Sequence, residues 1–129
     1  MSANLIRYLW AFPNTLVGLL FLPAAFRRGS GVQVVEGVLE IHGPLVAAVL
    51  RRLPIDGGAA AITFGHVVFG RTARTLVLTR THERVHVRQC ERWGPAFIPA
   101  YLLASAWAGL RGRGAYEGNY FEREAYRCE

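Results

Sequence analysis

Two histidines four residues apart, with a glutamate beside the first, form the segment of this chain whose residue types are best suited to chemistry. The segment is His82-Glu83-Arg84-Val85-His86. On a helix, residues four apart lie one turn apart on one face, so both imidazoles can reach one tetrahedral metal ion. Glu83 can take a proton from a metal-bound water and pass it to a leaving amine. The spacing predicts a zinc site with His82 and His86 as ligands and Glu83 as the catalytic base.

A hydrolytic zinc site needs a third protein ligand, because it usually keeps three protein groups and one water. No histidine follows His86 in the sequence, so a third histidine downstream is excluded. The remaining candidates are the glutamates that follow the pair: Glu91, Glu117, Glu122, Glu124 and Glu129. Glu91 would lie on a different face of the same helix and cannot close the tetrahedron. The residues themselves leave the other four open.

The segment Phe121-Glu122-Arg123-Glu124-Ala125 resembles the Phe-Glu-x-x-Ala-Asp box of the membrane gluzincins, the HtpX and CAAX-endopeptidase group. The run from His82 to Gln89 is similar to the His-Glu-x-x-His-Val-x-Gln pattern of small bacterial minigluzincin-like proteins. The resemblance implies that Glu122 is the third zinc ligand, with Glu124 as the alternative. It also implies a zinc metallopeptidase acting on a peptide or protein substrate. Tyr126 departs from the pattern, because the family has aspartate there.

The expected fold class is α+β, similar to the minigluzincins. It comprises an N-terminal apolar helix, a small antiparallel sheet, a helix carrying both histidines and a C-terminal helix carrying the third glutamate. Residues 73–93 lack proline and glycine until Gly94-Pro95 ends the run, which predicts the histidine helix. Asn119 is a candidate cap for a helix within residues 116–127. The whole chain, 1–129, is expected to be a single domain, with residues 61–127 as the zinc-metallopeptidase-like core.

The β-branched residues of two segments predict strands. Val32 to Ile41 is expected to form a hairpin that turns at Glu36-Gly37. Ala61 to Phe69 is expected to be one strand that runs toward the metal motif. By the gluzincin resemblance this strand would pair with an extended substrate, and His66 would polarise the substrate carbonyl. The alternative for His66 is a hydrogen-bonded structural group.

Two apolar segments raise the question of a membrane. Residues 5–26 are mostly apolar and are flanked by Arg7 and by Arg27-Arg28, which predicts a membrane segment with a basic cytoplasmic end; the alternative is a buried core helix. Residues 95–110 cannot cross the bilayer once, because His86 and Glu122 would then lie on opposite sides. They are expected to form a re-entrant hairpin broken at Pro99, an interfacial helix or part of the core.

The composition of the chain indicates which kinds of partner it binds. The 129 residues carry a formal net charge of +6, supplied by scattered arginines without lysine, and 52% of them are hydrophobic. Basic residues beside apolar segments favour anionic lipid over nucleic acid and indicate a membrane-associated protein on the cytoplasmic side. Two cysteines are too few for a disulfide framework, which fits a reducing compartment. The alternative to a peptidase is a non-catalytic, zinc-stabilised module that binds a membrane or protein partner.

Overall fold

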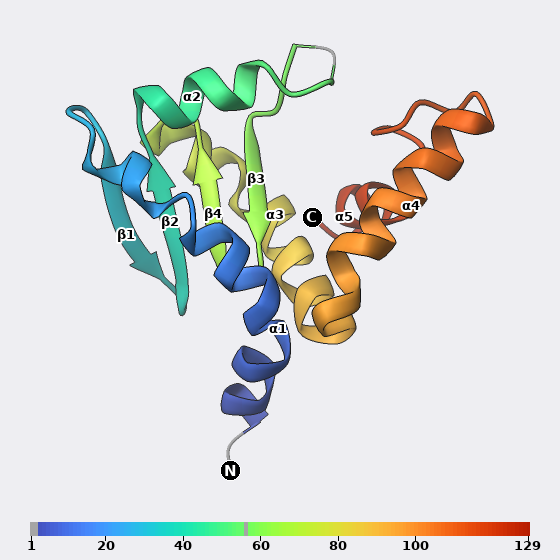
Figure 1. Cartoon of the computed structure of the whole chain (residues 1–129), viewed down its shortest axis with the longest axis horizontal. Coiled ribbons are helices and arrows are strands. Elements are labelled where there is room, and N and C mark those ends of the chain that lie inside the picture. The colour runs from blue at the N-terminus through green and yellow to red at the C-terminus, as the bar shows by residue number, and fades with distance from the viewer. Residues whose placement is uncertain (1–2, 56) are drawn as a thin grey trace.

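The computed structural model describes residues 3–55 and 57–129. These residues form five α-helices and one four-stranded sheet, joined by loops (Figure 1). The helices are α1 (Ala3–Leu19), α2 (Pro44–Arg51), α3 (Ala73–Trp93), α4 (Phe97–Leu110) and α5 (Tyr120–Cys128). The strands are β1 (Gly31–Val35), β2 (Val38–His42), β3 (Ala61–Phe64) and β4 (Val67–Gly70). Two 3₁₀ helices complete the set, η1 (Leu22–Phe26) and η2 (Gly94–Ala96). The predicted mixed α+β class is confirmed.

The sheet has the strand order β1-β2-β4-β3 and is mixed. The predicted hairpin is confirmed: β1 and β2 pair antiparallel, and both turn residues, Glu36 and Gly37, have positive φ angles, of 52° and 79°. β2 and β4, however, pair in parallel. The expectation of an antiparallel sheet is wrong at this pair. After β2 the chain passes through α2 into β3, which runs opposite to β2, and the turn between β3 and β4 then reverses it, so β4 runs in the direction of β2.

The predicted single strand over residues 61–69 is also wrong. Gly65 has a φ of +62°, so the chain reverses at Gly65-His66, and β3 and β4 pair antiparallel on either side of that turn. A Cβ at Gly65 would overlap Thr15 of α1, which explains why glycine occupies this turn. The consequence is that β3 becomes the strand at the sheet edge next to α3, while β4 is buried along its whole length.

The two faces of the sheet carry separate cores. Val67 and Phe69 of β4 pack with Ile41, Val46 and Leu50 on the face covered by α2 and η1. On the other face, the alternating residues Val38 and Val68 pack with Leu76 and Val87 of α3. A third apolar cluster joins α1, α3, α4 and α5, and consists of Ala11, Cys90, Phe97 and Phe121. Together these clusters place α3 between the sheet and the two C-terminal helices, as Figure 1 shows.

The bounds of α3 agree with the prediction. Thr72 caps its N-terminus, because the Thr72 hydroxyl accepts a hydrogen bond of 3.0 Å from the Thr75 N–H. Gly94 ends it with a φ of +59°. The C-terminal helix begins later than residue 116, at Tyr120, directly after its predicted cap Asn119.

The two apolar segments are both helical. Residues 5–26 are divided between α1 and η1. Residues 97–110 form the continuous helix α4, and Pro99 lies in its first turn, where its missing N–H disrupts no bond. Of the three alternatives for this segment, the re-entrant hairpin broken at Pro99 is therefore wrong for the described residues. Within the described ranges, no helix is both long and apolar enough to cross a membrane.

Candidate metal centre

His82 and His86 of α3 converge on Glu122 of α5. The Nε2 atoms of both histidines lie 3.1 Å from Oε1 of Glu122. One ligand atom from each of the three residues lies within 4.8 Å of the other two, and all three residues are buried. Two imidazole nitrogens and one carboxylate oxygen form a donor set that suits a divalent metal ion such as zinc. The structure thus brings together the three predicted ligands in a group that could hold a metal ion.

Asn119 fixes the position from which α5 presents Glu122. Its Oδ1 accepts a hydrogen bond of 2.8 Å from the Phe121 N–H, which caps the helix. Its Nδ2 donates to Tyr101 O at 3.0 Å and to Ser105 Oγ at 2.7 Å, both in α4. Because Asn119 is completely buried, these bonds tie the first turn of α5 to α4 and direct Glu122 toward α3.

The outer nitrogen of each histidine has its own partner. Nδ1 of His82 lies 2.9 Å from Oε2 of Glu129, and Nδ1 of His86 lies 2.8 Å from Oε1 of Gln89. Nε2 of Gln89 donates to Phe121 O and to Glu124 Oε1, which fixes the amide so that Oε1 faces His86. Since both partners are acceptors, each Nδ1 carries a proton. The Nε2 lone pairs of the neutral imidazoles are then free for a metal.

Without a metal, the side chains of His82 and His86 form ion pairs with the Glu122 carboxylate. Burial lowers the pKa of both histidines, but the hydrogen bonds to the Glu122 carboxylate and the negative charges of Glu122 and Glu83 together outweigh burial and raise both pKa values, that of His86 to about 9. Burial likewise raises the pKa of Glu122, while the hydrogen bonds from the two histidines lower it well below its ordinary range. Tyr101 adds a further hydrogen bond from its hydroxyl to Glu122 Oε2 at 2.5 Å. The metal-free group therefore favours imidazolium rings around a carboxylate.

Glu83 lies beside this group without joining it. Its Oε2 is 3.9 Å from Nε2 of His82, and its Oε1 accepts a hydrogen bond of 3.1 Å from the hydroxyl of Thr63 in β3. Burial raises the pKa of the Glu83 carboxyl, and the positive charge of His86 and His82 lowers it in part. A carboxyl with a raised pKa, next to a metal site and facing a cavity, is suited to exchange protons.

A cavity of about 280 Å³ opens over the group. His82, Glu83, His86 and Glu122 all line it. The rest of its wall is mainly apolar and comes chiefly from β3 and α4, with Ile55 and Tyr116 from loops: Ile55, Ala61, Ile62, Thr63, Phe64, Phe97, Ile98, Tyr101, Leu102 and Tyr116. The potential ligands and Glu83 are therefore accessible from one hollow that is bordered by a strand at the sheet edge.

Two other predicted site residues lie elsewhere. His66 does not line this cavity; its Nε2 lies 2.8 Å from Oε2 of Glu91, near a different face of α3. Its expected contact with a substrate carbonyl at the metal site does not fit this position, whereas the alternative of a hydrogen-bonded structural group does. Glu124 accepts from Gln89 Nε2 at 2.8 Å and lies 3.8 Å from Arg92. It is a neighbour of the metal group rather than a member of it.

Two residues that contact the site, Thr63 and Tyr101, were not predicted from the sequence. Gln89 and Glu129 were named, Gln89 in the run that resembles the minigluzincins and Glu129 as a candidate third ligand, but their contacts with the two histidines were not predicted. The contact of Gln89 with His86 could have been predicted, because Gln89 lies three residues after His86 on the same helix face. The other three are distant in sequence from the residues they contact and carry no local signal.

Comparison of the chain with models of protein families, with curated protein sequences and with solved structures finds no match. The geometry of the site thus carries the functional argument.

Proposed function

We propose that this protein is a zinc-dependent metallopeptidase that works at a membrane surface. The observation that carries the proposal is the convergence of His82 and His86 with Glu122 from a separate helix, with Glu83 facing the same cavity. Three protein ligands leave one coordination position for water or substrate, which is the arrangement of catalytic rather than structural zinc sites. A structural site would also have no use for a buried carboxyl next to its ligands.

The chain's own groups have distinct roles in peptide hydrolysis. Zinc bound by His82, His86 and Glu122 would lower the pKa of water and polarise the scissile carbonyl. Glu83 takes a proton from the attacking water and delivers it to the nitrogen of the leaving amine. Thr63 orients the Glu83 carboxyl through its hydroxyl. Glu129 and Gln89 keep the two imidazoles in the tautomer that offers Nε2 to the metal.

The edge strand β3 supplies a binding surface for an extended peptide. β3 ends the sheet order, so one row of its backbone groups is not paired with another strand of the described sheet. Ala61, Ile62, Thr63 and Phe64 of β3 all line the cavity. A peptide that adds to this edge as a further strand would run past Glu83, with its apolar side chains against the cavity wall.

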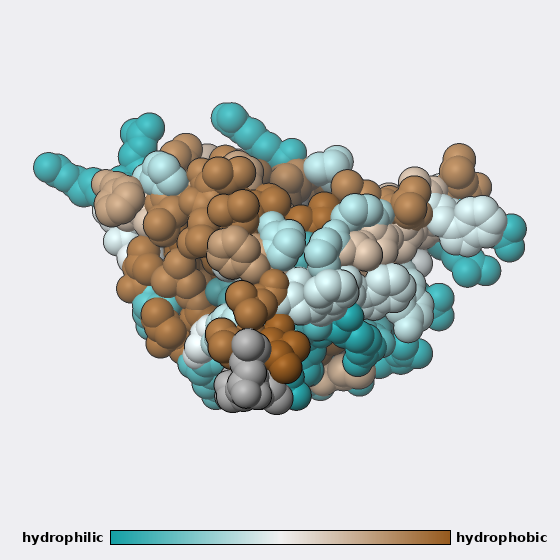
Figure 2. All heavy atoms as spheres, turned by 60° about the horizontal axis from the view of Figure 1, so that its bottom comes forward, coloured by the Kyte–Doolittle hydropathy of each residue, from teal (hydrophilic) through white to brown (hydrophobic). Residues whose placement is uncertain are grey.

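The membrane part of the proposal rests on exposed apolar side chains. α1 exposes Ile6, Leu9, Trp10, Phe12 and Leu16, and α4 exposes Leu102, Leu103, Trp107 and Leu110. Figure 2 shows hydrophobic side chains gathered over a large part of one face of the molecule, next to hydrophilic groups. Apolar helix surfaces with tryptophan and nearby arginine are typical of proteins that lie in the lipid interface. Anionic lipid would place the protein on the cytoplasmic side.

Substitution of Glu83 by glutamine separates the peptidase from the alternative, a non-catalytic zinc-stabilised interaction module. Glu83→Gln should keep stoichiometric zinc and lose about a hundredfold or more in the rate of peptide cleavage, because the base is removed without a change of shape. Cleavage of a quenched-fluorescent peptide library and zinc content by mass spectrometry measure the two effects. Glu117→Gln, an exposed carboxylate outside the cavity, is the control and should change neither. Peptide cleavage that survives Glu83→Gln undiminished would refute the peptidase and leave the interaction module.

A further inference from the structure

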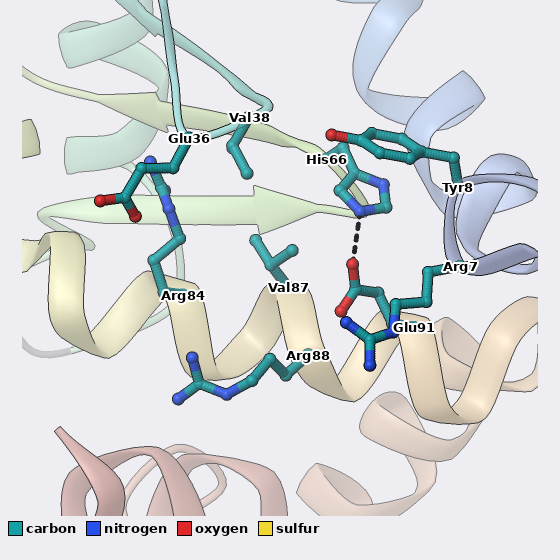
Figure 3. A pocket seen from close by; sticks show the side chains of 9 residues that line it. All are labelled: Arg7, Tyr8, Glu36, Val38, His66, Arg84, Val87, Arg88 and Glu91. Atoms are coloured by element: carbon teal, nitrogen blue, oxygen red, sulfur yellow. Dashed lines mark hydrogen bonds and ion pairs between the residues drawn. The ribbon is translucent and has the colours of Figure 1, made fainter. Parts of the chain in front are cut away.

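A second cavity, of about 260 Å³, lies on a different face of α3 and shares no lining residue with the metal cavity. α1 contributes Arg7 and Tyr8, the β1–β2 turn contributes Glu36, and β2 contributes Val38. α3 contributes Arg84, Val87, Arg88 and Glu91, with His66 from the β3–β4 turn (Figure 3). Its volume is below the roughly 300 to 1,000 Å³ of pockets for drug-sized ligands, so it suits a small group.

The charges of this cavity favour an anion. Three arginines line it against two glutamates, and Glu91 already lies 2.8 Å from Nε2 of His66. Arg7 and Arg88 are exposed, and neither forms an ion pair with any residue in the described parts of the chain. Both side chains line the same hollow, with the Arg7 guanidinium beside Glu91 and the Arg88 side chain directed away from Arg7 (Figure 3).

Arg84 is the third arginine, and its hydrogen bonds are incomplete. Its Nη2 donates to Glu40 Oε2 at 2.8 Å and to Val35 O at 3.1 Å. Its Nε and Nη1 are buried and have no partner among the residues that the structure describes. Glu40 also holds Arg80 in a two-pronged contact, so one buried carboxylate faces two guanidinium groups. Buried donors without acceptors are costly, and an acceptor-rich ligand would satisfy them.

We propose that this cavity is a binding site for a phosphate-type oxyanion. Arginine presents forked N–H donors that match the oxygens of such a group, and three arginines line one small hollow. Tyr8 holds the wall together: its hydroxyl donates to Gly37 O at 2.7 Å, and its ring stacks on His66 at 4.1 Å between ring centroids. These contacts fix the first turns of α1, and with them Arg7, against the β1–β2 turn. The site is independent of the metal centre and of the proposed peptidase activity.

Two sources could supply the oxyanion: free phosphate or the headgroup of an anionic phospholipid. Arg7 lies in the same turn of α1 as the exposed Ile6 and Leu9, so a headgroup in the cavity could keep its acyl chains beside apolar residues. The shared chemistry is tested first, and the source second.

The first arm titrates inorganic phosphate into the full chain by calorimetry, with chloride added to keep the ionic strength constant. Saturable binding of one phosphate per chain is expected, with affinity reduced about tenfold or more by Arg7→Gln and by Arg88→Gln, the loss typical of a charge-assisted hydrogen bond. Arg74→Gln, an exposed arginine of α3 outside the cavity, removes the same charge and should leave the affinity unchanged. Removal of zinc by a chelator should also have no effect.

The second arm measures sedimentation with phosphatidylcholine vesicles that contain or lack phosphatidylglycerol. Selective loss of binding to the anionic vesicles in Arg7→Gln and Arg88→Gln assigns the site to a lipid headgroup, whereas phosphate binding without such a loss assigns it to a free oxyanion. Absence of saturable phosphate binding overturns the proposal. An equal loss of phosphate affinity in Arg74→Gln also overturns it, because net charge alone would then explain the binding.

Discussion

At the residue scale, protons and metal compete for the same two nitrogens. In the metal-free chain, the hydrogen bonds to Glu122 raise the pKa of His82 and raise that of His86 to about 9. Zinc binds only the neutral imidazole, so each bound zinc must displace these protons. The affinity for zinc and the stability of the metal-free chain must therefore change with pH in opposite directions.

The free energy of unfolding of the metal-free chain should decrease from pH 6 to pH 9. A histidine whose pKa is raised on folding stabilises fully below its unfolded value of 6.5, and this contribution is lost as the pH rises through about 9. Glu122, whose pKa is lowered, contributes above 4.5 and loses that contribution as the pH falls. The two together give the metal-free chain its highest stability at about pH 4.5 to 6.5.

Urea unfolding in the presence of a chelator at pH 6, 7.5 and 9 measures this dependence. The gain in the free energy of unfolding on addition of zinc should instead increase over the same pH range, because zinc then has fewer protons to displace from the histidines. A metal-free chain that is equally stable at pH 6 and pH 9 would show that the histidines do not hold Glu122 in the way described.

The neighbours of the ligands should tune the affinity for zinc without being essential to it. Glu124→Gln replaces the charged acceptor of the Gln89 amide by a neutral one, and Glu129→Gln does the same to the acceptor of His82 Nδ1. Each substitution should reduce the affinity for zinc about 10- to 100-fold. Glu122→Gln removes a ligand and should abolish stoichiometric binding. Competition with a chromogenic chelator gives the three affinities. If Glu124→Gln lost zinc while Glu122→Gln kept it, Glu124 and not Glu122 would be the third ligand.

Some residues of the site could be predicted from the sequence, and others only from the structure. The spacing of His82, Glu83 and His86 identifies three residues because a helix fixes their relative positions. Glu122 required the resemblance to the gluzincin box, since no local pattern links it to α3. Tyr101 and Thr63 could not be predicted, because their contacts depend on how α4 and β3 pack against the site.

At the element scale, the turn between β3 and β4 positions the edge strand beside Glu83. Gly65 combines a left-handed backbone with a close approach to Thr15 of α1, and the adjacent His66 N–H donates to Thr15 Oγ1 at 3.0 Å. The turn therefore joins the sheet to α1 as well as reversing the chain.

Gly65→Ala should destabilise the protein by more than Gly112→Ala does. Both glycines have positive φ angles, of 62° and 70°, so alanine costs about 1 to 2 kcal/mol of backbone strain at each. Only Gly65 has neighbours where the Cβ would lie; the space around Gly112 is open. Overpacking should add about 1 to 3 kcal/mol at Gly65 alone. Equal losses in the unfolding free energy of the two variants would contradict the close packing of this turn against α1.

Long periodic elements were predictable and short connections were not. The bounds of α3 follow from a run without proline or glycine that ends at Gly94-Pro95. The reversal at Gly65-His66 was read as a glycine within one strand, because apolar residues flank it on both sides and no local signal shows that the two halves pair. The parallel pairing of β2 with β4 likewise depends on this reversal, because α2 leads into β3 and only the turn after β3 restores the direction of β2.

At the scale of the whole molecule, α4 exposes much of its apolar surface. Leu103 is 71% and Trp107 61% exposed, and only Phe97 and Ala108 of α4 are buried. An exposed apolar helix beside the metal cavity would bring the site close to a lipid surface if α4 lies in the interface.

The double variant Leu103→Ser/Trp107→Ser should bind lipid vesicles about tenfold or more weakly, since the transfer of each such side chain out of water contributes about 1.5 to 3 kcal/mol. Vesicle sedimentation measures the partition coefficient. Val34→Ser is the control, because Val34 is 70% exposed on β1, at the sheet edge remote from α4 (Figure 1). Equal binding by the double variant and the wild type would exclude α4 as the membrane contact.

Zinc-edge anomalous diffraction from crystals of the zinc-loaded protein tests the central claim most directly. A single strong peak is expected about 2.0 to 2.2 Å from Nε2 of His82, Nε2 of His86 and one carboxylate oxygen of Glu122, with Glu83 outside bonding distance. A peak at any other set of residues, or a fully loaded protein in which Glu122 does not contact the metal, would contradict the account of this site.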